Sequence, residues 1–138
     1  MRSLTTLCLF VCLTFTLKAQ SKRLGYSRNE IIASSGYNYD TGTNDNGYKY
    51  IAYSHYNNYG LVSEAYYFNN QSICIFFRYI YPIEAINEVI KELNSNFVQT
   101  DKWKWKDYSK DMVYILTKDD NQPLIFDLVG NFSNTIIH

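Results

Sequence analysis

The distribution of tyrosine constrains the fold of this chain more than any other feature of its sequence. All 14 tyrosines lie beyond residue 25, and nine of them fall between Tyr37 and Tyr67. Tyrosine favours half-buried strands, where its ring packs against the core and its hydroxyl reaches water. The sequence therefore predicts a protein dominated by β-sheet. It also predicts that some tyrosines of the dense stretch reach the surface.

The first 20 residues have the pattern of a cleavable secretory signal peptide. One arginine precedes an uncharged apolar run over residues 4–17. This run is shorter than the roughly 20 apolar residues that a membrane-spanning helix needs. We predict cleavage after Ala19 or Gln20, which leaves a single domain of residues 21–138 that is exported to the periplasm or the outside. An uncleaved N-terminal anchor is the alternative.

Removal of the predicted leader changes the cysteine count and the charge. Two of the three cysteines lie in the leader, and the remaining Cys74 sits in an apolar run that suggests a buried, inert thiol. Without an internal disulfide, a domain of about 118 residues must be held by one hydrophobic core. The leader also carries two of the 13 basic residues, so 11 basic residues face 13 acidic ones. This slightly acidic balance predicts no nucleic-acid partner. No later apolar run is long enough to predict stable membrane insertion after cleavage.

Two helices are predicted from capping and periodicity. Ser27 and Glu30 have the spacing of a capping box for a short helix over residues 27–34, which Gly36 is well placed to end. Pro82 opens a second helix, in which large apolar residues recur at spacings of three and four. The predicted buried face of this helix consists of Ile83, Ile86, Ile90, Leu93 and Phe97.

Six strands are predicted from alternating or continuous apolar runs bounded by turn residues. They cover residues 48–53, 62–68, 72–81, 102–106, 112–117 and 124–129, and the polar stretch 40–47 is expected to be a loop. Strand 72–81 is the most apolar and is expected at the centre of the sheet. In the stretch 102–106, strict alternation predicts an edge strand with Trp103 and Trp105 on one buried face. A nucleic-acid surface built from these rings and the neighbouring lysines is the alternative.

The order of these elements defines the predicted fold class. Short connections between consecutive strands favour an antiparallel sheet, and helices that cover one face of such a sheet make an α+β fold. We therefore predict an antiparallel sheet with two helices packed on one face. The order also suggests two helix-plus-three-strand units that join near Tyr81 and Pro82.

This layout resembles the small exported bacterial modules of the PepSY and beta-lactamase-inhibitor-protein-like (BLIP-like) type, including their BamE/SmpA relatives. The run from Ser27 to Ile32 before Gly36 is similar to the short helix that opens such units, and the order of elements extends the resemblance over residues 27–129. Those modules mostly bind or inhibit other exported proteins. The resemblance therefore implies a binding role without naming a target.

No combination of residues predicts catalysis. A hydrolase needs a nucleophile, a base and an orienting group together, yet His138 ends the chain and His55 lies near the end of a tyrosine-rich strand. The spacing in residues 40–47 fails the calcium-loop pattern, and one cysteine with one histidine does not make a usual zinc site. We expect no metal and no cofactor. A small enzyme remains an alternative that requires His55 and an acidic residue to meet in a concave pocket.

Exposed tyrosines carry the predicted function. Rigid amphipathic rings mixed with Asn and Asp suit contact with proteins or carbohydrates. We predict an exported, non-enzymatic binding module that contacts an exported protein or envelope component through a tyrosine-rich sheet surface, with a carbohydrate-binding module as the alternative. The plainer interpretation is that tyrosine is simply the strand-forming residue of this domain. The predicted binding residues are Tyr37, Tyr39, Tyr48, Tyr50, Tyr53 and Tyr56.

Overall fold

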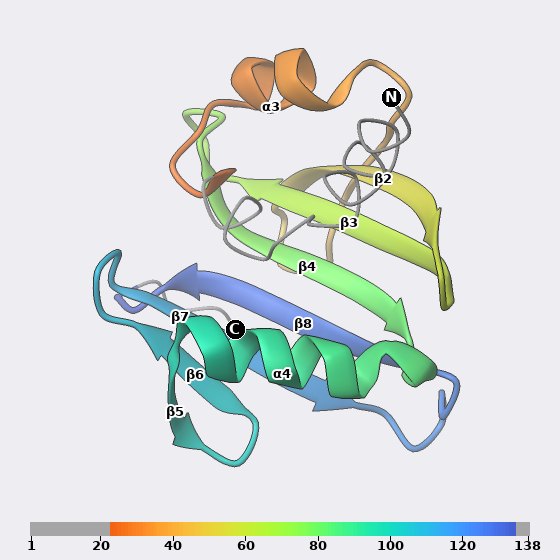
Figure 1. Cartoon of the computed structure of the whole chain (residues 1–138). Coiled ribbons are helices and arrows are strands. Elements are labelled where there is room, and N and C mark those ends of the chain that lie inside the picture. The colour runs from red at the N-terminus through yellow and green to blue at the C-terminus, as the bar shows by residue number, and fades with distance from the viewer. Residues whose placement is uncertain (1–22, 135–138) are drawn as a thin grey trace, which may run out of the picture.

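A computed structural model of the chain describes residues 23–134. The signal peptide predicted for residues 1–20 lies outside this range. Within the range, two α-helices and eight antiparallel strands confirm the predicted α+β fold. The helices are small relative to the sheet (Figure 1).

The strands follow one another as two meanders, each preceded by a helix. The first unit comprises α3 (Arg28–Ser35), β1 (Asp40–Thr43), β2 (Lys49–Asn57), β3 (Gly60–Phe68) and β4 (Cys74–Pro82). The second unit comprises the 3-10 turn η2 (Ile83–Ala85), α4 (Ile86–Asn96), β5 (Val98–Asp101), β6 (Lys104–Asp107), β7 (Met112–Lys118) and β8 (Ile125–Phe132).

All strands belong to one sheet with the order β1-β2-β3-β4-β8-β7-β6-β5. The order is symmetric about its central pair, β4 and β8, which are matched over seven residue pairs from Phe76↔Asn131 to Pro82↔Ile125. The central position predicted for the strand that became β4 is confirmed. Each unit has four strands, whereas the sequence predicted three strands for each unit.

The two strands that sequence reasoning missed are β1 and β5, which form the two edges of the sheet. Strand β1 reads Asp-Thr-Gly-Thr and strand β5 reads Val-Gln-Thr-Asp, and neither contains a fully buried residue. An edge strand without a core face needs no apolar alternation, which is the signal used to predict strands. The stretch 40–47, predicted to be a loop, is therefore half strand and half turn.

The structure also corrects the placement of the two tryptophans. Lys102 and Trp103 form the turn between β5 and β6, so the predicted continuous strand is interrupted and lies second from the edge. Trp105 is fully buried, and its Nε1 donates a hydrogen bond to Asn94 Oδ1 of α4 at 2.8 Å. Trp103 is 38% exposed. The predicted burial of both rings therefore holds for Trp105 but not for Trp103.

Both hydrogen bonds of the capping box predicted for α3 are present. The Glu30 amide donates to Ser27 Oγ at 3.2 Å, and the Ser27 amide donates to the Glu30 carboxylate at 2.7 Å. Gly36 ends the helix with a φ of 95°, which a residue without a side chain adopts most readily.

The apolar face of α4 is rotated from the predicted one. Val89 and Leu93 are its most buried residues, whereas Ile86, Ile90 and Phe97 are half-buried at the margins. The segment at Ile83–Ala85 is a 3-10 turn with about three residues per turn, so it does not continue the α-helical period from which the face was predicted.

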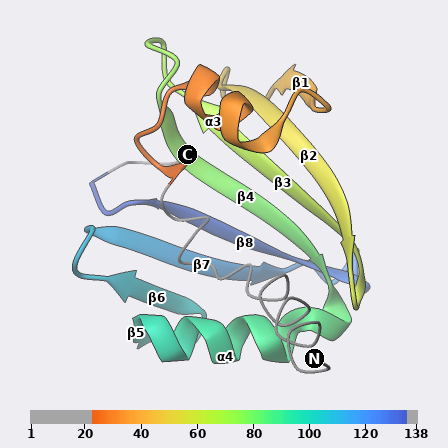
Figure 2. The same cartoon turned by 45° about the horizontal axis from the view of Figure 1, so that its top comes forward.

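Both helices pack on one face of the sheet, which we call the inner face. Ile31 and Ile32 of α3 belong to the same buried cluster as Val89 and Leu93 of α4, and inner-face residues of the central strands, such as Tyr79, complete it. Figure 2 shows the two helices near opposite ends of the sheet, α3 over the first meander and α4 beside β5 and β6. The inner face between the two helices therefore holds a cleft, described below.

A glycine at the centre of the sheet makes room for an aromatic ring. Phe77 of β4 is paired with Gly130 of β8, and the fully buried Phe77 ring lies against the glycine where a Cβ would stand. We expect Gly130→Ala to lower the free energy of unfolding by about 1–3 kcal/mol, because the buried ring has no space into which it can move. Urea denaturation followed by tryptophan fluorescence measures this loss.

Gly42→Ala is the matched control for this prediction. Gly42 is paired with Tyr50 and lies under that ring in the same way, but Tyr50 is only half-buried beside an edge strand. Because this ring can swing outward, we expect a loss below about 1 kcal/mol. Equal losses in the two variants would show that burial of Phe77 is not what makes Gly130 necessary.

Candidate functional site

An open cleft of about 1230 Å³ lies on the inner face between α3 and α4. Strands β2, β3 and β4 form its floor, the end of α3 forms one wall, and α4 forms the other. Charged side chains line its interior, and tyrosine and asparagine side chains from the β2–β3 hairpin line its mouth. The residues that matter most are Arg23, His55, Tyr59 and Glu64.

A buried carboxylate sits in the floor of the cleft. Glu64 lies in the middle of β3, and only 6% of its surface is exposed. The hydroxyl of Tyr66 donates to Glu64 Oε2 at 3.0 Å, and the hydroxyls of Tyr66 and Tyr79 are 3.1 Å apart. Because a hydroxyl has one proton, the Tyr79 hydroxyl is the donor to Tyr66. A buried carboxylate is costly unless it is hydrogen-bonded, and this chain of phenols offsets part of that cost.

Arg23 supplies the positive charge that accompanies Glu64. Its Nη1 donates to the Tyr66 hydroxyl at 2.7 Å and lies 3.9 Å from Glu64 Oε2. Its guanidinium also lies over the Tyr66 ring, with 5.2 Å from Cζ to the ring centroid. The segment after Arg23 is tied to β4, because the Gly25 amide donates to the Cys74 carbonyl and the Cys74 amide donates to the Tyr26 carbonyl, both at 2.8 Å. These bonds hold the arginine over the sheet.

His55 approaches the same carboxylate from β2. The β2–β3 register pairs Tyr53 with Glu64 and His55 with Val62, which places all four side chains on the inner face. His55 Nδ1 lies 3.8 Å from Glu64 Oε1, and 48% of the histidine side chain is exposed. A histidine and an acidic residue therefore meet in a concave cleft, which is the condition that the enzyme alternative required. Chemically, an imidazole that can exchange a proton with a ligand lies beside the fixed carboxylate of Glu64.

The six predicted binding tyrosines do not form one surface. Tyr53 lines the cleft, and Tyr37, which is 85% exposed, precedes the cleft-lining Asn38. Tyr56 borders the cleft at the β2–β3 hairpin, but alternation along β2 gives its ring the same direction as that of Tyr50, away from the cleft. Tyr39 packs against Tyr53 with ring centroids 5.9 Å apart. The Tyr53 hydroxyl donates to the Gly36 carbonyl at 2.9 Å, so this ring also ties β2 to the end of α3.

The remaining two, Tyr48 and Tyr50, lie on the opposite face of the sheet, which we call the outer face. Tyr50 contacts Tyr67 with ring centroids 5.3 Å apart, and Tyr48 contacts Phe76 at 5.5 Å. Tyr67 and Phe76 are stacked on each other at 4.3 Å. Successive residues of a strand point to opposite faces, so a run that contains both Tyr50 and Tyr53 must divide its tyrosines between the two.

Sequence reasoning missed Arg23, Tyr59 and Glu64. A signal for Glu64 was present, because it stands two residues from both Val62 and Tyr66 and therefore shares their apolar face. A charge on the buried face of a strand needs a partner, and this need marks it as a candidate site residue. No pattern in the sequence indicated Arg23, because its role depends on where the chain crosses the sheet.

Comparison with protein-family models, with curated proteins and with solved structures finds no match. Over residues 23–134, no group of three or more His, Cys, Asp and Glu side chains is arranged to hold a metal ion. No helix in this part of the chain is long and apolar enough to cross a membrane.

Burial raises the pKa of several groups beneath the cleft. Tyr66, Tyr79 and Tyr81 have a phenol pKa above the ordinary value of 10.0, chiefly because burial disfavours the charged form. Glu64 adds a negative charge that raises the pKa of all three further. Burial likewise raises the pKa of the Cys74 thiol from 9.0 to about 12. The prediction that Cys74 is buried is confirmed.

These shifts predict unfolding in base. A group whose pKa is higher in the folded state contributes its full stability below the pKa of the unfolded chain and loses it as pH rises. We therefore expect the free energy of unfolding to fall as pH rises above about 9 to 10, where Cys74 and then the tyrosines would ionise in the unfolded chain. Circular dichroism and tyrosinate absorbance, recorded together against pH, measure this effect.

The two signals should show a shared transition, because the buried phenols ionise only when the protein opens. Tyr37→Phe removes a phenol that is 85% exposed and should leave the pH of that transition unchanged. Complete ionisation of all tyrosines while the circular dichroism stays native would contradict the prediction.

Proposed function

We propose that this protein is an exported, non-enzymatic binding module that holds a segment of a partner protein in the cleft between α3 and α4. The observation that carries the proposal is the cleft itself, which joins a fixed ionic floor to an exposed tyrosine and asparagine mouth. Export rests on the predicted signal peptide. The resemblance to PepSY and BLIP-like modules, which mostly bind other exported proteins, points to the same class of function.

The dimensions of the cleft support a macromolecular ligand. Small-molecule pockets usually measure about 300–1,000 Å³ and enclose most of their ligand. This cleft is larger, at about 1230 Å³, and it is open to solvent along the mouth. An extended segment that enters the cleft while the rest of its chain remains outside suits this shape.

The mouth of the cleft has the composition of a recognition surface. Tyr59 is 43% exposed, and it follows Asn57 and Asn58 at the tip of the β2–β3 hairpin. Tyrosine supplies large contact area at a low cost in conformational entropy, and asparagine supplies adaptable hydrogen bonds. The Asn57 Oδ1 accepts from the amides of Tyr59 and Gly60 at 2.8 and 3.1 Å, so the hairpin is already ordered before a partner arrives.

Charge in the interior favours a polypeptide over a neutral glycan. Arg23 and Glu64 lie in the floor, and Glu88 and Lys91 line the wall formed by α4. Charged groups of both signs complement the charged side chains and backbone dipoles of a protein segment and exclude partners with the wrong pattern. A neutral sugar would stack on the tyrosines at the mouth but would bring no charge to pair with the charged groups of the interior.

Photo-crosslinking tests the proposal directly. A photoreactive phenylalanine analogue replaces Tyr59 in the full-length protein, which is expressed in its native host and irradiated. We expect a discrete protein adduct from position 59, because Tyr59 is partly exposed and lines the mouth of the cleft. Mass spectrometry of the adduct identifies the partner and the segment that was in contact.

Two other positions serve as controls. Tyr108 is 66% exposed in the second unit, outside the cleft, and should give no adduct. Tyr50 lies on the outer face, within the tyrosine-rich sheet surface that the sequence suggested. An adduct from position 50 but not from position 59 would assign the contact to the outer surface instead of the cleft, and adducts from all three positions would indicate unspecific contact.

Carbohydrate binding is the alternative use of the same mouth. Titration of the purified protein with cell-wall and polysaccharide fragments separates the two functions. A saturable response that Tyr59→Ser abolishes, without a protein adduct from position 59, would favour the glycan. A protein adduct without any glycan response favours the partner protein.

The contact between His55 and Glu64 favours one further candidate, a small acid–base enzyme. Within residues 23–134, His55 donates no hydrogen bond to a serine or other nucleophile, and for this reason we place binding first. Assays with chromogenic esters, glycosides and phosphate esters test the candidate, with His55→Ala as the comparison. Turnover that His55→Ala removes from a folded protein would overturn the non-enzymatic assignment.

A further inference from the structure

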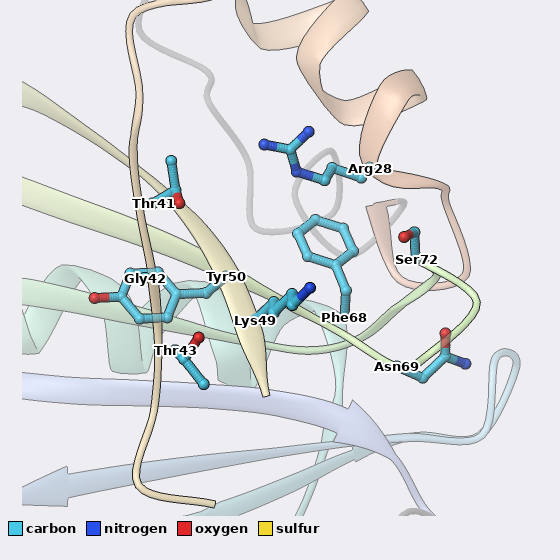
Figure 3. A pocket seen from close by; sticks show the side chains of 9 residues that line it. All are labelled: Arg28, Thr41, Gly42, Thr43, Lys49, Tyr50, Phe68, Asn69 and Ser72. Carbon is cyan, nitrogen blue, oxygen red and sulfur yellow. The ribbon is translucent and has the colours of Figure 1, made fainter. Parts of the chain in front are cut away.

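A second cavity, of about 450 Å³, lies at the other end of α3 from the cleft (Figure 3). It opens where the first turn of α3 faces β1, β2 and the β3–β4 connection. Its polar lining consists of two cations, three hydroxyls and one amide: Arg28, Lys49, Thr41, Thr43, Ser72 and Asn69. The ring of Phe68 adds apolar surface.

The register of the strands brings several of these residues into one row. Thr43 is paired with Lys49, and Lys49 is paired in turn with Phe68, so the three side chains lie side by side on the inner face. Thr41 points to the same face, because it stands two residues before Thr43. The cavity is thus built by three paired strands and is not a gap between mobile loops.

Arg28 reaches the cavity from the helix and is held in place. Its backbone amide donates to the Ser72 carbonyl at 2.9 Å, which ties the start of α3 to the β3–β4 connection. Its Nη2 donates to the Tyr39 hydroxyl at 3.4 Å, and its Cζ lies 5.5 Å from the centre of that ring. The other donors of the guanidinium have no protein partner among the described residues, and Figure 3 shows the group extending from α3 toward β1.

No carboxylate neutralises these two cations. Among the described residues, neither Arg28 nor Lys49 takes part in an ion pair, and no acidic side chain lines the cavity. The carboxylate of Glu30 is turned to the Ser27 amide at 2.7 Å. Asp40 precedes Thr41 on its strand, so its side chain points to the opposite face. Two positive charges and three hydroxyls therefore converge without an internal counter-ion.

We propose that this cavity binds a tetrahedral oxyanion, a phosphate or sulfate ester, attached to a ring or another apolar body. The guanidinium fork and the ammonium group complement the charge of such an ester, and the hydroxyls of Thr41, Thr43 and Ser72 donate to its remaining oxygens. The cavity lies within the usual size of small-molecule sites and exceeds the needs of an inorganic ion. The ring of Phe68 offers a surface for the attached body.

Titration of the isotopically labelled protein with phenyl phosphate, followed by amide resonances in NMR, tests the site. We expect saturable shifts at Gly42, Thr43 and Ser72, with inorganic phosphate giving the same shifts at lower affinity because it lacks the ring. Arg28→Gln and Lys49→Gln each remove a charged hydrogen-bond donor, and each should weaken the binding of phenyl phosphate by about tenfold or more. Circular dichroism confirms that each variant is folded.

Lys118→Gln is the matched control, because it removes one positive charge from an exposed position at the end of β7. It should change the affinity by less than about twofold, since surface charges at this distance are screened. Equal weakening by Lys118→Gln and Lys49→Gln would show general electrostatic attraction and overturn the site. Lys49 is exposed, so its variant keeps the test decisive even where Arg28→Gln fails to fold.

Two further probes distinguish a soluble metabolite from a lipid headgroup as the natural source of the oxyanion. Glucose 1-phosphate represents a soluble phosphorylated metabolite, and vesicles of phosphatidylglycerol, compared with phosphatidylcholine alone, represent a lipid headgroup. Binding of either probe that Lys49→Gln weakens supports the site and identifies its source. A failure of phenyl phosphate, glucose 1-phosphate and both kinds of vesicle to bind overturns the proposal.

Discussion

The antiparallel pairing of β4 with β8 is the contact on which the rest of this structure depends. Each half of the chain is a helix followed by a four-stranded meander, and the two halves meet in the sheet only through this pair. A four-stranded sheet with one short helix has little apolar surface to bury. Joined at β4 and β8, the halves share one core, in which the Phe77 ring of β4 lies against Gly130 of β8. Cys74 is the one cysteine of residues 23–134 and is a free thiol, so within this range the shared burial is not supplemented by a disulfide.

The same pairing creates the space for a binding site. The two helices lie near opposite ends of the inner face, so the middle of that face is left open between them. An exposed apolar floor would be an aggregation hazard. The floor instead carries Glu64, which is held by Tyr66 and Arg23. Removal of one member of such a buried network costs about 3–5 kcal/mol in comparable proteins, so the network serves the fold as well as the cleft.

Local patterns predicted those parts of the structure that local chemistry controls. The capping box of Ser27 and Glu30 and the stop at Gly36 are confirmed because they involve only neighbouring residues. The α+β class followed from the alternation and spacing of apolar runs. The edge strands β1 and β5 escaped prediction because strands that bury no residue carry no apolar period. Trp103 was misplaced because alternation continued through a turn that only the pairing of β5 with β6 defines.

The sequence by itself determined that the chain is rich in sheet, that two short helices interrupt it, and that tyrosine supplies much of its aromatic surface. These properties follow from side-chain chemistry and from spacing along the chain. Only the tertiary structure decided which tyrosines lie together, because the register of β2 against β3 sends Tyr53 to the inner face and Tyr50 to the outer one. It also decided that Arg23, His55 and Glu64 converge, and that Arg28 and Lys49 face a cavity without a carboxylate. These groups are distant in sequence, and the pairing of strands brings them within reach of one another.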